Sequence, residues 1–139
     1  MAIHLDTSPT AGSFDVFSYD WSKVAVPPLP PGATKIEILF YPNPGRLSPA
    51  DVLQQQLDQR TQRGEAIGII TKQSVTVAGR ASLEVSEGPH NGPGFGGYTI
   101  TYMIPHGVTM LWLSQAGPPS GAPSAVLTHM VQSLTLTGA

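Results

Sequence analysis

Residues 75–88, VTVAGRASLEVSEG, decide the fold class of this 139-residue chain. Apolar side chains occupy every second position on both sides of Gly79, with Val77 before it and Leu83 and Val85 after it. A period of two is typical of strands with one buried face. The stretch therefore predicts two antiparallel strands, near 67–77 and 80–87, joined by a tight turn at Gly79.

Two further runs with the same period follow a glycine-rich loop. Residues 98–104 and 108–116 are separated only by Pro105-His106-Gly107, which is typical of a β-hairpin. The second run has apolar residues at both odd and even positions, so we expect both of its faces to be buried. Its apolar side chains are Val108, Met110 and Trp112 on one face and Leu111 and Leu113 on the other.

Two helices are expected among these strands. Ser48 and Pro49 suit the N-cap and first position of a helix over 49–63. Residues 123–134 carry one apolar face at helical spacing. Earlier runs predict strands near 14–21 and 35–41, and residues 1–13 are expected to be a flexible leader before a single domain at 14–139.

The resulting order is β, β, α, β, β, β, β, α. Consecutive antiparallel strands with one inserted and one final helix predict the α+β class. We expect an antiparallel β-sheet covered by helices on both faces, which is an α/β/α sandwich. The predicted core residues are Leu53, Leu57, Leu83, Ile100, Trp112, Leu127, Met130 and Leu134.

Composition argues against several classes of function. Charged residues make up 12% and the net charge is −2 without a basic cluster, so we expect no nucleic-acid partner. The chain has no cysteine, which excludes disulfides and thiolate chemistry. No apolar run approaches ~18 residues, so we expect no transmembrane segment. The compartment is cytoplasmic if Met1 is the native start, and extracytoplasmic if a signal sequence or lipid anchor has been removed.

No catalytic or metal-binding constellation is predicted, and we expect no cofactor. The four histidines show no paired spacing that a metal site would need. Residues 92–97, GPGFGG, match the pattern G-x-G-x-x-G, but a strand follows where a dinucleotide-binding motif opens a helix. We interpret residues 88–97, GPHNGPGFGG, as a loop beside the sheet.

This loop and the nearby hairpin tip are the candidate binding surface. Phe95 is an aromatic side chain flanked by glycines, which suits a binding contact on a loop. His90 and His106 would add polar contacts that change near pH 6.5, and Tyr98 lies at the end of the loop.

With that order of elements, the chain resembles the PsbP-like superfamily. This group includes the photosystem II extrinsic protein PsbP, nuclear Ran-binding proteins of the same fold and bacterial lipoproteins. The resemblance rests on the aromatic run at 17–21, the helix at 48–63, the turn VAGRAS at 77–82, the Tyr-rich hairpin and the pair Ser133-Leu134. It implies a largely non-catalytic protein that acts by binding or by assisting assembly.

The sequence thus favours a non-catalytic binding or assembly module whose partner is a protein. The alternative is a small ligand-binding protein or enzyme with a site near residues 88–97. An apolar pocket with several convergent polar side chains would favour the alternative, and a solid core with a flat aromatic surface patch would favour the protein-binding module.

Overall fold

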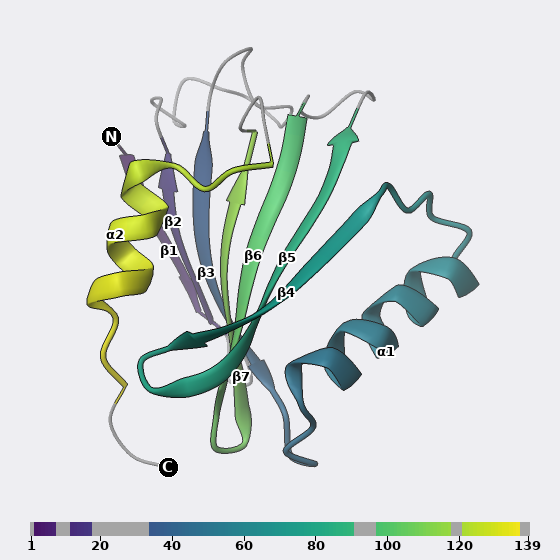
Figure 1. Ribbon diagram of the computed structural model, residues 1–139, viewed down its shortest axis with the longest axis horizontal. Coiled ribbons are helices and arrows are strands. Elements are labelled where there is room, and N and C mark those ends of the chain that lie inside the picture. The colour runs from purple at the N-terminus through teal and green to yellow at the C-terminus, as the bar shows by residue number, and fades with distance from the viewer. Residues whose placement is uncertain (1, 8–11, 18–33, 91–96, 118–120, 137–139) are drawn as a thin grey trace.

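The computed structural model describes residues 2–7, 12–17, 34–90, 97–117 and 121–136. Within these residues, seven strands form one antiparallel sheet with the spatial order β1-β2-β3-β7-β6-β5-β4, and two helices lie on opposite sides of it (Figure 1). The elements in chain order are β1 (Ala2–Thr7), β2 (Gly12–Phe17), β3 (Lys35–Pro42), α1 (Pro49–Gln62), β4 (Ile70–Val77), β5 (Arg80–His90), β6 (Gly97–His106), β7 (Thr109–Ala116) and α2 (Ala125–Ser133).

The predicted antiparallel pairing is confirmed. The β6–β7 hairpin pairs Ile104 with Leu111 and closes at His106 and Thr109, on either side of the predicted turn. One strand was missed, because the segment 1–13, predicted to be a flexible leader, contains β1, which pairs with β2. The strand predicted at 14–21 is β2, which ends at Phe17, and the rest of that prediction lies outside the described residues.

One face of the sheet packs against α2. Leu127 of α2 is fully buried, and Met130 and Val131 pack beside it. Ser124 is the N-cap of α2, because its hydroxyl accepts the backbone N–H of Leu127 at 3.2 Å. The buried residues of this cluster, which we call the α2-side core, are Ile36, Val77, Ile100, Tyr102, Ile104, Leu111, Leu113 and Leu127.

The opposite face packs against α1. Its buried cluster, the α1-side core, consists of Leu53, Leu83, Val85, Met103 and Met110. Trp112 of β7 packs against this cluster, whereas Leu111 and Leu113 belong to the other face. Both faces of β7 therefore pack against a core, as its apolar residues predicted. Val108 is an exception to that prediction, because it lies before β7 and is 53% exposed.

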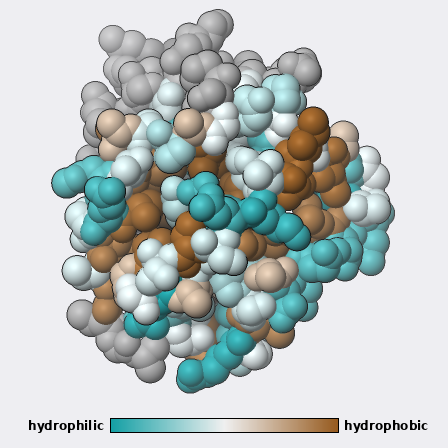
Figure 2. Space-filling model, in the orientation of Figure 1, coloured by the Kyte–Doolittle hydropathy of each residue, from teal (hydrophilic) through white to brown (hydrophobic). Residues whose placement is uncertain are grey.

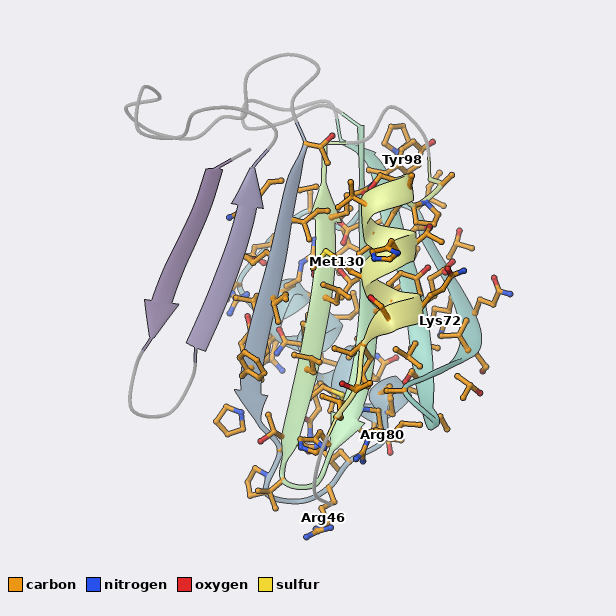
Figure 3. The ribbon with its side chains drawn as sticks, turned by 90° about the vertical axis from the view of Figure 1, so that its left-hand side faces the viewer. Arg46, Lys72, Arg80, Tyr98 and Met130 are labelled. Carbon is orange, nitrogen blue, oxygen red and sulfur yellow. The ribbon has the colours of Figure 1, made fainter. Side chains whose placement is uncertain are left out.

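The predicted helix-covered sandwich is wrong, because the two helices are too small to cover the sheet. Seven strands span roughly 30 Å across the sheet, whereas a helix with its side chains is about 10 Å wide. The closest approach of α1 is to β5 and β6. Figure 3 shows α2 in front of the middle strands and no helix in front of β1, β2 and β3. The protein is mainly an antiparallel sheet with a helix docked on part of each side.

The helices themselves explain this limited cover. Leu53 is the buried residue of α1 and Leu127 that of α2. Of the predicted core residues, Leu53, Leu83, Ile100 and Leu127 are buried. Leu57, Trp112, Met130 and Leu134 are only partly buried, because they lie at the margins of the helix contacts. No helix in the described part of the chain has the length and apolar character needed to cross a membrane.

A short hydrogen bond links β5 to β6 on the face of α2. The phenol of Tyr102 donates to Glu84 Oε2 at 2.5 Å. Burial raises the pKa of Tyr102 above its usual value of about 10, and the hydrogen bond and negative charge of Glu84 raise it further. The native state thus favours the protonated phenol.

This shift predicts a loss of stability in alkaline solution. Below pH ~10 the phenol of Tyr102 is protonated in both states, and above it the unfolded chain releases the proton first. The free energy of unfolding therefore falls as pH rises past ~10. In Tyr102→Phe the decline should be shallower, although burial also raises the pKa of Tyr41 and a residual slope should remain. Urea denaturation at several pH values measures both slopes, and equal slopes would contradict the assignment.

Truncation of Leu127 tests how firmly α2 is docked. Leu127→Ala should lower the free energy of unfolding by about 2–5 kcal/mol, from lost transfer energy and a residual cavity. Val126 is the matched control, because this neighbour is 43% exposed and Val126→Ala should cost less than about 0.5 kcal/mol. A loss below about 1 kcal/mol for Leu127→Ala in chemical denaturation would mean that α2 is loosely held.

Candidate functional site

An ion pair joins α1 to the sheet. Arg60, in the last turn of α1, reaches Glu87 of β5 with Nη1 at 2.6 Å from Oε1 and Nη2 at 2.9 Å from Oε2. The Glu87 side chain is only 11% exposed and that of Arg60 is 26% exposed. Two parallel charge-assisted hydrogen bonds are the strongest geometry for this pair. The hydrogen bond with Glu87 raises the pKa of Arg60, so its guanidinium stays charged.

The same two side chains hold the chain segment at 65–69, which connects α1 to β4. Arg60 Nη2 also donates to the carbonyl of Ala66 at 3.2 Å, and the amide of Gly68 donates to Glu87 Oε2 at 3.1 Å. The amide of Gly88 donates to the carbonyl of Ile69 at 3.1 Å. The backbone of the segment is therefore fixed by contacts with both α1 and β5.

Two isoleucines of this segment point away from the core. Ile67 is 36% exposed and Ile69 is 73% exposed. Figure 2 shows hydrophobic surface over the segment and the start of β4, beside the hydrophilic surface of α1. The next element, β4, is an edge strand of the sheet, at the front of Figure 1. Most side chains of β4 are exposed as well.

A cavity of about 200 Å³ lies between α1 and the sheet, beside the ion pair. Its wall comes from α1, β4, β5, β6 and β7 and is apolar over most of its length. The residues that line it are Leu53, Gln56, Leu57, Arg60, Ile70, Val85, Glu87, Thr99, Thr101, Met103 and Trp112.

Trp112 contributes an aromatic wall to this cavity. The ring of Tyr41 meets it edge to face, with centroids 5.1 Å apart. The Trp112 Nε1 is buried, and among the described residues no acceptor lies within hydrogen-bonding distance. A buried donor without a partner costs about 1–3 kcal/mol, so it is uncommon in native proteins.

The structure separates the residues that the sequence placed in one binding surface. His90 ends β5 opposite Gly97, whereas His106 ends β6 opposite Thr109. His106 lies nine positions after Gly97 along β6, which is about 30 Å of strand. The two histidines thus belong to opposite ends of the sheet. Tyr98 lies at the same end of the sheet as His90.

The predicted site residues differ in what surrounds them. Phe95 lies outside the described residues, as does the rest of the segment 91–96. Tyr98 is half-buried beside Gly88, whose φ is +146° and where a Cβ would lie 2.9 Å from Tyr98 Cδ1. Only glycine allows this approach of β5 to β6. At the other end, the Nδ1 of His106 is buried and has no hydrogen-bond partner among the described residues.

The pair of Arg60 and Glu87 and the cavity beside it were not anticipated from the sequence. The sequence did contain one signal. Glu87 lies two and four positions after Val85 and Leu83 on the same strand, so its side chain belongs to the same face of the sheet, the face of α1. A carboxylate on a buried face needs a cation. The sequence does not show which cation, since Arg60 is 27 residues away.

Comparison with known proteins provides no family assignment. No family model, no curated protein and no solved structure matches this chain.

Removal of one charge tests how much the ion pair contributes. Glu87→Gln keeps the size of the side chain but leaves Arg60 without its main counter-charge, so we expect a loss of about 1.5–3 kcal/mol of unfolding free energy. Hydrogen exchange at the amide of Gly68 should accelerate, because this amide donates to Glu87 Oε2.

Glu65→Gln is the matched control for this substitution. Glu65 also faces Arg60, with Oε2 at 3.5 Å from Nε, but its side chain is 48% exposed. Exposed pairs contribute at most about 1 kcal/mol. Equal losses of unfolding free energy in the two variants would contradict a special role for Glu87.

Proposed function

We propose that this chain is a non-catalytic binding module that recognises a protein through the segment at 65–69 and the adjoining edge strand β4. The observation that carries the proposal is the exposure of Ile67 and Ile69 on a backbone that Arg60 and Glu87 hold in place. Exposed apolar side chains that stand together mark interaction sites more often than scattered ones do.

The fixed backbone supports a role in recognition. A surface that is already ordered loses little conformational entropy when a partner binds, so more of the contact energy remains as affinity. Ile69, at 73% exposed, has most of its apolar surface still available for burial.

The edge strand indicates how a partner would bind. An edge strand presents backbone N–H and C=O groups along its outer side, and an extended segment of another protein can add to it as a further strand. The partner expected here is such a segment, with an apolar side chain that packs on Ile67 and Ile69. Lys72 in the middle of β4 opposes indiscriminate pairing at this edge, so a partner must offset its charge.

The resemblance to the PsbP-like superfamily supports the same class of function, since that group acts largely by binding or assisting assembly. Membership of this superfamily is part of the proposal.

The alternative, a small ligand-binding protein, is supported by a different observation. Glu87 and Thr99 line the cavity under α1, and they stand immediately before and shortly after the loop at 88–97. This cavity supports the alternative of a small-molecule site near that loop.

Substitution of Ile69 tests the protein-binding surface. Ile69→Ser should remove specific partners from the set captured by the immobilised chain in a lysate of the source cell, because it removes the largest exposed apolar contact. Val108→Ser is the matched control, since Val108 is also an exposed aliphatic residue, at 53%, but lies at the far end of the sheet. With an identified partner, hydrogen exchange along β4 should slow.

An unchanged set of captured proteins with Ile69→Ser would contradict this surface. Loss of the same partners with Phe95→Ala, but not with Ile69→Ser, would move the surface to the loop at 88–97.

A further inference from the structure

The cavity under α1 is large enough for a small organic molecule. Its volume is about 200 Å³, and it is partly open to solvent. An apolar cavity of roughly 150 Å³ is sufficient to bind benzene. The space beside α1 therefore accommodates one six-membered ring with a substituent.

The wall is apolar around the body of such a molecule and polar at one end. Leu53, Val85 and Met103 come from the α1-side core and face the cavity. Thr101 lines it as well, and its hydroxyl lies 3.0 Å from that of Ser114. This combination of an apolar wall and a few polar groups is typical of small-molecule sites.

The charges at the cavity favour a neutral occupant. Arg60 and Glu87 neutralise one another through two hydrogen bonds. An anion near Arg60 would meet the carboxylate of Glu87, and a cation near Glu87 would meet the guanidinium of Arg60. Either ligand would have to displace a bidentate ion pair, which is the strong form of this interaction.

Trp112 supplies a second, independent observation. Its ring lines the cavity, and its indole N–H is buried and has no acceptor among the described residues. Buried donors in native proteins are nearly always paired, and an unpaired one calls for an explanation. A ligand with a hydrogen-bond acceptor provides that partner when the ring turns its N–H towards the cavity, and the binding of phenol over toluene tests this turn.

From the volume, the neutral ion pair and the unpaired donor, we infer that this cavity binds a neutral, single-ring molecule that carries one hydrogen-bonding group. This site lies on the inner side of α1, so it is separate from the protein-binding surface proposed above. Either proposal can fail without the other.

The probe for this site is phenol, and the readout is the methyl NMR signal of each methionine. Met103 lines the cavity, whereas Met130 packs on the opposite face of the sheet and serves as an internal control. Phenol should shift the Met103 signal saturably, with a dissociation constant in the millimolar range or tighter, as expected of so small a ligand. Benzoate and benzylamine should bind at least ~10-fold more weakly, and so should toluene, which has no acceptor.

A variant that fills the cavity completes the test. Leu57 is partly buried at the cavity wall, so Leu57→Trp should abolish the phenol-dependent shift of Met103. Val126→Trp on the exposed side of α2 is the matched control and should leave the shift unchanged. The dispersion of the other methyl signals reports whether each variant is folded, and Thr101→Val, which removes one hydroxyl, should weaken phenol more than toluene.

Three results would overturn the inference. One is the absence of a Met103 shift in the folded wild-type chain at about 10 mM phenol, well above the affinity expected of a specific small ligand. Another is an equal shift at Met103 and Met130. The third is benzoate or benzylamine binding as tightly as phenol.

Discussion

Arg60 and Glu87 meet where α1, the segment at 65–69 and β5 come together, and this ion pair ties the helix and the segment to the sheet. The apolar contribution of α1 is small, since Leu53 is its buried residue. Withdrawal of two charges from water is costly, and here the bidentate geometry and the added bonds to Gly68 and Ala66 offset that cost. The pair therefore adds a polar contact to the small apolar contact that holds α1 on the sheet.

Both proposed sites adjoin this ion pair. On its outer side the pair holds the backbone that carries Ile67 and Ile69, and on its inner side it forms the polar end of the cavity. A neutralised pair lets the cavity remain largely apolar although two charged side chains line it. The same contact thus adjoins both an exposed apolar surface and a partly open cavity.

The sheet itself depends less on the helices. β6 and β7 bury side chains on both faces, with Ile100 and Ile104 towards α2 and Met103 towards α1. Consecutive antiparallel ladders satisfy the backbone hydrogen bonds of these strands without help from a helix. This explains how helices of 14 and nine residues can leave much of the sheet uncovered.

The alternation around Gly79 and the breaker at Pro105-His106-Gly107 were enough to predict β4 to β7 and their antiparallel pairing, because these signals are local. The cap at Ser48 and the apolar face of residues 123–134 predicted the two helices in the same way. Local signals also placed Leu83 and Ile100 in the core. They did not reveal β1, and they overestimated the helical cover, because cover depends on the width of a sheet whose strand count a sequence does not show. The ion pair joins residues 27 positions apart, and the cavity draws its wall from five elements. Only the tertiary structure brings such distant residues together, since no period or spacing along the chain encodes which side chain of a helix will face which end of a strand.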